Sequence, residues 1–241
     1  MEKLIQFFAF LFSFISWLFD FGNSERRHIL GKIRFYTLVS YIRQKKIWEL
    51  IDHIEQKKIK GSFVECGVWR GGTAAILAYR AQREKKGRQV HLFDSFVGLP
   101  EPSKEDGNAA YLFAGKHATG KLRSIQKVVG TLSDVKKLFF SVLRLKKEHI
   151  FFHKGWFQNT LPKKKKEAGQ IALLHIDGDW YASVKVCLEE FYDAVVTGGF
   201  ILFDDYGYWP GCKRAVDEFL AKKGKKIVLH KIDFSGVYIE K

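Results

Sequence analysis

The 241-residue sequence predicts one α/β fold, a doubly wound and mostly parallel sheet of seven strands with helices on both faces. Short apolar runs alternate along the chain with segments in which apolar residues recur at helical spacing. Several runs are apolar throughout, as expected of parallel strands that are buried on both faces. The last two runs are close enough in sequence to form an antiparallel hairpin. With 46% hydrophobic residues the chain can bury one full core, and the pattern is Rossmann-like.

Two patterns place the individual strands and helices along the chain. Apolar runs that end at a glycine, an acidic residue or a turn place strands at 62–66, 89–93, 149–153, 173–176, 201–203, 226–231 and 236–240. Apolar residues at helical spacing place helices at 31–58, 73–85, 133–145, 181–196 and 213–221. A loop rich in glycine and proline fills 95–120. We therefore expect a main domain over 61–241, preceded by a helical extension over 23–60.

An uncharged segment rich in phenylalanine begins the chain. Residues 4–19 carry no charge, and no small-residue cleavage site follows them, so a signal peptide is not expected. The segment is also shorter than the roughly 20 apolar residues that span a bilayer upright. A narrow polar face on a helical wheel indicates an amphipathic helix over 1–22. Contact with a membrane surface and packing against another subunit of a homo-oligomer both stay open for it.

Charge and cysteine content bound the partners and the compartment. Lysine and arginine outnumber aspartate and glutamate by 41 to 26, which gives a formal net charge of +15. The lysines fall in short clusters without a recognition motif, so a nucleic-acid partner is not expected. Cys66, Cys187 and Cys212 have no paired spacing, which argues against a disulfide framework. We therefore expect the chain in the cytoplasm, with association at the membrane surface left open.

Paired acidic residues end two of the predicted strands. Asp177 and Asp179 follow the run at 173–176, and Asp204 and Asp205 follow the next run. The stretch between the two runs leaves room for one crossover helix, as parallel strands require. The carboxyl ends of such strands meet at one edge of the sheet, where ligands bind. Carboxylates gathered there repel one another unless a cation lies between them, so the sequence predicts a metal site.

A glycine-rich turn follows the first predicted strand, and an acidic residue follows the second. Gly67, Gly71 and Gly72 let the backbone of this turn approach a nucleotide-type ligand closely. The spacing matches neither the dinucleotide-binding fingerprint nor the phosphate-binding loop. Asp94, at the end of the second strand, can accept hydrogen bonds from both ribose hydroxyls of an adenosine cofactor. Together the two features favour adenosine binding over a purely structural turn.

Six motifs occur in order along the chain. They are GVWRGG at 67–72, DSFVGLP at 94–100, GWFQNTLP at 155–162, DGD at 177–179, GFILFDDY at 199–206 and CKRAVD at 212–217. Each motif alone is a modest signal, but six in order, within about 61–219, are specific, and this series resembles the macrocin O-methyltransferase family. The resemblance implies a class I methyltransferase domain over 61–241 that uses S-adenosylmethionine and acts on a sugar hydroxyl.

The resemblance also implies which residues bind the cofactor. They are Glu65, Gly67, Arg70, Gly71, Gly72, Thr73, Asp94, Ser95, Gly155 and Trp156. The glycine-rich turn would hold the methionine part of the cofactor. Asp94 and Ser95 would hold the ribose, and Gly155 and Trp156 would line the adenine pocket.

The reaction that the resemblance implies is metal-assisted O-methylation. Asp177, Asp204 and Asp205 would bind a divalent cation, and magnesium is expected because all-oxygen ligation suits a hard cation. Such a cation would lower the pKa of the acceptor hydroxyl and orient it toward the methyl donor. Asp177 and Asp179 are the predicted catalytic residues, with Asp179 as the base. Asp179 can equally be a fourth ligand, or cap the helix expected from Tyr181.

Two other functions fit parts of the sequence. The positive charge would suit a methyltransferase that acts on RNA, but the chain lacks the Asn-Pro-Pro-Tyr type of motif used on exocyclic amines. A membrane-associated, non-enzymatic relative would have no reason to keep clustered carboxylates, which cost stability. We therefore expect a small molecule or a glycan as the partner, and the acceptor itself is not encoded in any pattern that we can read.

Overall fold

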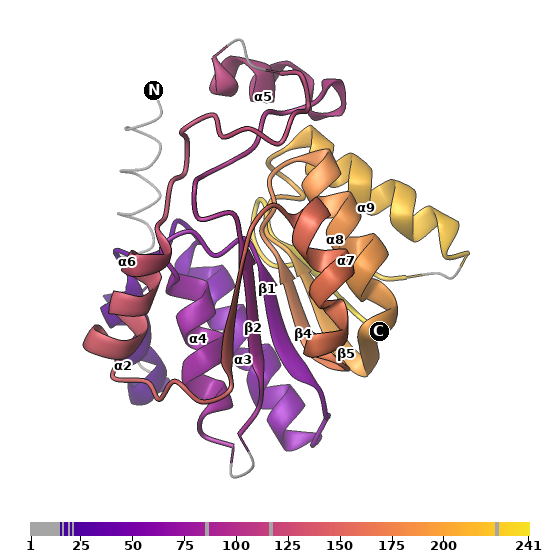
Figure 1. The fold of residues 1–241 in the computed structure, drawn as a ribbon. Helices are drawn as coiled ribbons and strands as arrows, with labels where there is room; N and C mark the ends of the chain where they lie inside the picture. Colours follow the sequence, from indigo (N-terminus) through magenta and orange to yellow (C-terminus); the bar gives the residue numbers. More distant parts are fainter. Residues whose placement is uncertain are drawn as a thin grey trace.

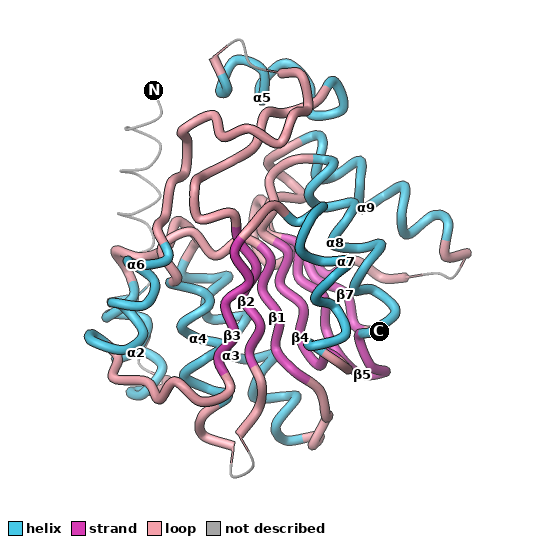
Figure 2. Tube along the Cα trace, viewed as in Figure 1, coloured by secondary structure: helices cyan, strands magenta, loops and turns pink. Residues whose placement is uncertain are grey.

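The structure, a computed structural model, describes residues 15, 17, 18, 20, 22–84, 87–115, 118–224 and 227–241. Its centre is the predicted seven-stranded sheet, with strand order β3-β2-β1-β4-β5-β7-β6 (Figure 1 and Figure 2). β1 to β5 pair in parallel, whereas β7 pairs antiparallel with β5 and β6, which confirms the expected C-terminal hairpin. The strands are β1 Ser62–Cys66, β2 Val90–Asp94, β3 Ile150–Lys154, β4 Ile171–Ile176, β5 Val195–Phe203, β6 His230–Lys231 and β7 Val237–Glu240.

Helices cover both faces of this sheet, as the doubly wound pattern predicts (Figure 1). Buried apolar side chains form two clusters, one under α2, α3, α4 and α6 and the other under α7, α8 and α9. The helices are α2 Ser24–Ile33, α3 Tyr41–Gln56, α4 Gly72–Ala81, α5 Gly107–Ala114, α6 Leu132–Lys136, α7 Phe157–Ala168, α8 Tyr181–Phe191 and α9 Pro210–Lys222. A π-helical segment, Lys137–Val142, continues α6.

The helices differ from the sequence-based prediction in three places. The helix expected over 31–58 is two helices, because the chain breaks after α2 and Ser40 caps α3 by accepting the Arg43 N–H at 3.2 Å. α7 was not predicted, since a run of lysines and an internal Pro162 obscure its helical pattern. α5 lies inside the segment expected to be a loop. The strand expected over 226–231 is limited to β6 in the part that the structure describes.

The predicted N-terminal helix over 1–22 lies mostly outside the described residues, so its role stays a prediction. Near its end, Trp17 Nε1 donates a hydrogen bond to the Arg27 carbonyl at 2.8 Å. The Asp20 carboxylate accepts hydrogen bonds from Arg26 at 2.7 Å and from Tyr41 at 2.5 Å. These contacts tie the segment to α2 and α3. Among the described helices, none combines the length and the apolar character needed to cross a membrane.

The parallel register brings the carboxyl ends of β1, β4 and β5 to the same level. Cys66 pairs with Ile176, and Ile176 pairs with Phe203. The pairing continues one step further, because Asp177 N–H donates to the Cys66 carbonyl at 2.8 Å and Asp204 N–H donates to the Ile176 carbonyl at 3.0 Å. The residues that follow these strands therefore start from neighbouring points at one edge of the sheet.

Candidate active site

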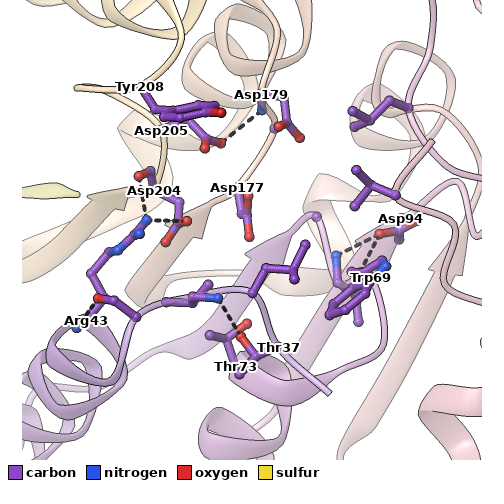
Figure 3. A pocket seen from close by; sticks show the side chains of 18 of the residues that line it. Thr37, Arg43, Trp69, Thr73, Asp94, Asp177, Asp179, Asp204, Asp205 and Tyr208 are labelled. Atoms are coloured by element: carbon purple, nitrogen blue, oxygen red, sulfur yellow. Dashed lines mark hydrogen bonds and ion pairs between the residues drawn. The ribbon is translucent and has the colours of Figure 1, made fainter. Parts of the chain in front are cut away.

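Four acidic side chains gather where β4 and β5 end (Figure 3). Single carboxylate oxygens of Asp177, Asp179 and Asp205 lie within 4.8 Å of one another. A second group with the same spacing consists of His175, Asp177 and Asp204. The predicted metal ligands are thus neighbours, but Asp204 and Asp205 belong to different groups that Asp177 joins. Asp179 is as close to this centre as the predicted ligands are.

Three of these carboxylates sit in an environment that disfavours their charge. Burial raises the pKa of Asp177 well above its usual value, and the charges of Asp204 and Asp205 raise it further. Burial and the Asp205 charge likewise raise the pKa of Asp179. For Asp205, burial and the Asp204 charge raise the pKa to about 7. Such mutual repulsion is relieved by a proton or by a cation.

Asp204 differs from the other three because basic side chains surround it. Its Oδ2 accepts a short hydrogen bond from Arg43 Nη1, and its Oδ1 lies 3.3 Å from His175 Nε2. Burial alone would raise the pKa of Asp204, but the Arg43 charge and the His175 hydrogen bond outweigh burial and lower it. Asp204 is therefore the carboxylate of this cluster that the protein itself keeps ionised.

Asp179 is held by its backbone and by a tryptophan. Its φ is +55°, its N–H donates to Asp205 Oδ2 at 3.2 Å, and its carboxylate accepts a hydrogen bond from Trp209 Nε1 at 2.9 Å. The alternative that Asp179 caps the next helix is wrong. The first N–H of α8, that of Tyr181, donates instead to Asp106 Oδ1 at 2.6 Å. Asp179 is left to face the acidic cluster.

The glycine-rich turn after β1 packs directly against the end of β4. Gly67 has a φ of +99°, and a Cβ there would lie 1.7 Å from the Asp177 carbonyl oxygen. Only glycine fits at this position, because both the backbone angle and the space exclude a side chain. Gly71, with a φ of +90°, opens the way into α4. The turn and the acidic cluster are therefore in direct backbone contact.

Asp94, the last residue of β2, binds the same turn through its carboxylate. Its carboxylate accepts hydrogen bonds from the N–H groups of Val68 at 2.7 Å, Trp69 at 3.0 Å and Phe96 at 2.6 Å. Burial raises the pKa of Asp94, while these three N–H groups act in the opposite direction. The predicted ribose acceptor thus already organises the loops on either side of it. Its neighbour Ser95 donates to the Gly98 carbonyl at 2.8 Å.

A buried chain of polar side chains links the glycine-rich turn to the acidic cluster. Thr73, at the start of α4, donates to Glu65, whose Oε1 also lies 2.9 Å from His175 Nδ1. His175 reaches Asp204 with its other ring nitrogen. Burial opposes charge on His175, but the hydrogen bonds to Asp204 and Glu65 raise its pKa to about 9. A protonated His175 therefore lies between two carboxylates beneath the site.

A cavity of about 580 Å³ opens above both groups of residues. The predicted site residues that line it are Gly67, Thr73, Asp94, Ser95, Trp156, Asp177, Asp179, Asp204 and Asp205. The structure thus brings the expected cofactor half and the expected metal half into one space. The aromatic side chains of Tyr208 and Trp209 also line the cavity, beside the acidic residues.

Five predicted cofactor residues do not line this cavity. Glu65 is fully buried below it, and Gly71 and Gly72 form the turn into α4. Arg70 turns away, because its Nη1 donates to the Phe35 carbonyl at 3.1 Å. Gly155 precedes Trp156 in the chain but does not line the cavity, and its N–H donates to the Asp94 carbonyl at 2.9 Å. These residues shape the turn and its surroundings in the structure.

Sequence reasoning missed the contribution of the N-terminal extension to the cavity. Residues 36–44, which connect α2 to α3 and begin α3, form a continuous part of its wall. Arg43 from this segment contacts Asp204, and Gly72 N–H donates to the Tyr36 carbonyl at 2.9 Å. No local signal in the sequence marks this segment, because its role arises only from packing against the sheet edge.

The donor groups fit the metal and the cofactor that the sequence suggested. Closely spaced carboxylate oxygens with raised pKa values are an all-oxygen set, which suits magnesium better than zinc. On the other side of the cavity, the turn at Gly67 presents backbone with no side chain toward the β4 end, and Asp94 and Trp156 flank it. That arrangement is what a nucleoside cofactor at the end of parallel strands requires.

Comparison with known proteins confirms the family that the sequence motifs predict. The family model described as Macrocin-O-methyltransferase (TylF) matches residues 20–241. The chain is 32% identical over 204 residues to demethyldecarbamoylnovobiocin O-methyltransferase of Streptomyces niveus, covering 84% of this chain and 74% of that protein. It is 28% identical over 207 residues to the 8-demethyl-8-(2,3-dimethoxy-alpha-L-rhamnosyl)-tetracenomycin-C 4'-O-methyltransferase of Streptomyces olivaceus, with the same two coverages.

One solved structure is similar to this chain in both fold and sequence. The structure of the O-methyltransferase NovP superimposes with a TM-score of 0.72 at 31% identity, covering 86% of this chain and 82% of that one. The match extends over most of both chains. On these grounds, the protein belongs to the macrocin O-methyltransferase family.

Proposed function

We propose that this O-methyltransferase transfers the methyl group of S-adenosylmethionine to a hydroxyl of a sugar or of a glycosylated small molecule, with a divalent cation, magnesium, in its site. One observation carries the proposal, namely that the acidic cluster and the glycine-rich turn share one cavity. The related enzyme of Streptomyces olivaceus supports the acceptor class, because its name describes a rhamnosyl group on tetracenomycin C.

The residues of the cofactor half are proposed to bind and orient the methyl donor. Gly67 and Thr73 would face its methionine part, Asp94 and Ser95 its ribose, and Trp156 its adenine. Glu65, Arg70, Gly71, Gly72 and Gly155 would act by holding the turn in shape. Methyl transfer needs in-line approach of the acceptor oxygen, and a preformed turn reduces the entropy that this alignment costs.

The residues of the metal half are proposed to hold the cation and to take the proton. Asp177, Asp204 and Asp205 would bind the cation, which when present would lower the pKa of the acceptor hydroxyl. Asp179 is the proposed base. Burial and the Asp205 charge raise its pKa, which makes it a stronger base than an exposed carboxylate, and its hydrogen bond from Trp209 fixes its carboxylate beside the cluster.

The acceptor is proposed to be a small molecule, because the cavity wall carries little positive charge despite the net charge of +15. Among the described residues that line the cavity, the basic ones are Arg34 and Arg43. Arg43 is already paired with Asp204 and Asp233. An RNA backbone would need several cations along its path, so RNA is the weaker candidate.

A transfer assay with matched acceptors tests this function. Methyl transfer is measured from S-adenosylmethionine to a rhamnosyl glycoside, the matching nucleotide sugar and a short RNA, each with magnesium, with a chelator, and with magnesium restored. We expect transfer to a sugar acceptor that the chelator abolishes and magnesium restores, with cofactor binding unaffected. Transfer that resists the chelator would overturn the metal role, and transfer to RNA alone would overturn the acceptor class.

A further inference from the structure

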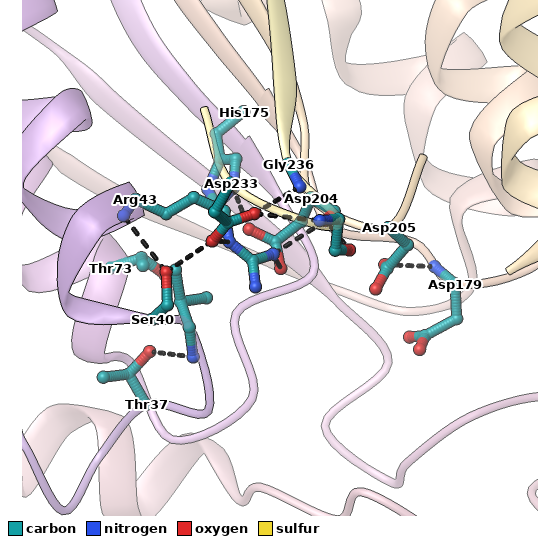
Figure 4. Close-up of polar contacts among 12 residues, drawn as sticks. Thr37, Ser40, Arg43, Thr73, His175, Asp179, Asp204, Asp205, Asp233 and Gly236 are labelled. Atoms are coloured by element: carbon teal, nitrogen blue, oxygen red, sulfur yellow. Dashed lines mark hydrogen bonds and ion pairs between the residues drawn. The ribbon is translucent and has the colours of Figure 1, made fainter. Parts of the chain in front are cut away.

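The predicted metal ligand Asp204 is held by a residue that lies outside the predicted methyltransferase domain over 61–241. Arg43, on α3 of the N-terminal extension, reaches over the end of β5 to its carboxylate (Figure 4). We propose that Arg43 is a positioning residue that fixes Asp204 for cation binding, and that Asp233 fixes Arg43 in turn. The inference rests on the proposed function, because it assumes that Asp204 binds a cation.

The guanidinium of Arg43 bridges two carboxylates. Its Nη1 donates to the carbonyl oxygen of Asp204 at 2.7 Å and makes a short hydrogen bond to Oδ2 of the same residue. Its Nε donates to Asp233 Oδ2 at 2.8 Å. Only 6% of Arg43 is exposed, so solvent does not compete for these bonds. Because the guanidinium fork is planar and rigid, two fixed carboxylates define its orientation.

The loop between β6 and β7 is built around this arginine. Asp233 Oδ1 accepts the N–H groups of Ser235 at 3.0 Å and Gly236 at 2.7 Å, which leaves Oδ2 for Arg43 and for the Ser40 hydroxyl. A Cβ on Gly236 would lie 2.3 Å from Arg43 Cδ, so the absence of a side chain makes room for the arginine. Ser235 Oγ also donates to the Asp204 carbonyl at 2.6 Å.

These contacts restrain both the backbone and the carboxylate of Asp204. Its carbonyl is held by Arg43 and Ser235, while its carboxylate oxygens are held by Arg43 and His175. A carboxylate restrained in this way has a fixed orientation, and so have the lone pairs that remain free to bind a cation. Residues that orient a metal ligand through hydrogen bonds commonly change metal affinity about 10- to 100-fold when altered.

The electrostatic effect of Arg43 has the opposite sign, which makes the inference testable. A positive charge beside the site repels a cation, so a purely electrostatic role predicts tighter cation binding when the contact is weakened. A positioning role predicts weaker binding. Arg43→Lys, which keeps the charge, therefore separates the two roles: charge alone predicts unchanged or tighter magnesium binding, and positioning predicts weaker binding.

Two variants are read together, because Asp233→Asn also removes a negative charge near the site and would by that alone weaken cation binding. An asparagine can keep its oxygen on the Ser235 and Gly236 N–H groups, and so preserve the loop. Its amide NH₂ then faces the N–H of Arg43, which removes the acceptor that orients the guanidinium. A second variant, Arg43→Lys, keeps the positive charge but loses the fork. Neither variant replaces any of the four acidic residues that form the cluster.

The measurement is calorimetric titration of magnesium into the full chain, alongside titration of S-adenosylmethionine. We expect both variants to lose about 10-fold or more in magnesium affinity, with cofactor affinity unchanged. The matched control is Arg80→Lys, because Arg80 is an equally buried arginine that pairs with Asp52 and Glu55 of the same α3. It should leave magnesium affinity unchanged.

The outcomes separate this inference from the function on which it rests. If the unaltered protein binds magnesium and Arg43→Lys binds it as tightly or more tightly, the positioning role is overturned alone. If Arg80→Lys weakens magnesium binding as much as Arg43→Lys, the effect is one of general stability, and the inference fails too. If the unaltered protein binds no divalent cation, the metal part of the proposed function fails, and this inference fails with it.

Discussion

Asp94, at the end of β2, and Asp177, just after β4, lie on either side of β1 and line the same cavity, yet their side chains meet opposite surroundings. The Asp94 carboxylate accepts three backbone N–H groups from the loops beside it. Asp177 faces other carboxylates, and burial together with the charges of Asp204 and Asp205 raises its pKa. The cofactor half is thus completed by the chain's own backbone, whereas the metal half is electrostatically incomplete until a proton or a cation joins it.

Asp177→Asn should have the largest effect, and it should be confined to the metal half. Asparagine keeps the shape but removes one ligand charge, so we expect methyl transfer to fall about 1000-fold, equivalent to about 4 kcal/mol of transition-state stabilisation. The free energy of unfolding measured without a cation should stay the same or rise, because one repelled carboxylate is gone. The measurements are kcat/KM, cofactor affinity and denaturant unfolding.

Unchanged cofactor affinity in Asp177→Asn would confirm that the two halves are separable, and a collapse of cofactor affinity would contradict it. Asp204→Ala is a poorer probe of the same question. It would leave the buried guanidinium of Arg43 and the ring of His175 without a partner, so lost activity would be mixed with lost stability.

Asp94→Ala should break the other half, through stability as well as binding. Each buried N–H left without an acceptor costs about 1–3 kcal/mol, and three would lose theirs. After relaxation we expect a loss of about 2–3 kcal/mol in the free energy of unfolding and at least a tenfold loss in cofactor affinity. Magnesium affinity should stay within a few fold. If unfolding is unaffected, Asp94 serves the ligand alone and the contrast with Asp177 is wrong.

The acidic cluster could be predicted because its signal is local and the fold rule is general. Each acid follows an apolar run that reads as a buried strand, and parallel strands deliver their ends to one edge. The division among the acids was not predictable. Asp204 is set apart by Arg43 and His175, and only the tertiary packing of α3 brings that arginine to β5.

The remaining differences arise from contacts between distant segments. Asp179 looked like a helix cap because it precedes Tyr181, but Asp106, far away in sequence, occupies that N–H. The helix α7 was missed because lysines dominate its sequence and it rests on the sheet through few apolar residues, among them Leu161 and Ala168. In both cases the local pattern was ambiguous, and packing decided the outcome.

The smallest expected effect is a pH-dependent stabilisation by magnesium that the metal half alone should show. The pKa of Asp205 is raised to about 7, and those of Asp177 and Asp179 are raised as well. The folded state therefore binds more protons than the unfolded state between about pH 4 and pH 7, and stability without a cation should fall as pH rises through that window. A cation that replaces these protons should stabilise more at about pH 8 than at about pH 5.5.

Thermal unfolding with and without magnesium at both pH values measures this difference. At about ten times its Kd a bound cation contributes about 1.4 kcal/mol, which corresponds to roughly 3–6 °C in Tm for a chain of this size. His175, whose pKa is raised from 6.5 to about 9, loses its stabilising contribution progressively between those two pH values, and because this loss occurs with and without magnesium, the difference between the two conditions removes it. Asp177→Asn should reduce the magnesium effect at both pH values, whereas Arg80→Lys should not. Equal stabilisation at the two pH values would show that the cation binds away from the carboxylates with raised pKa, and the contrast between the two halves would then rest on the wrong residues.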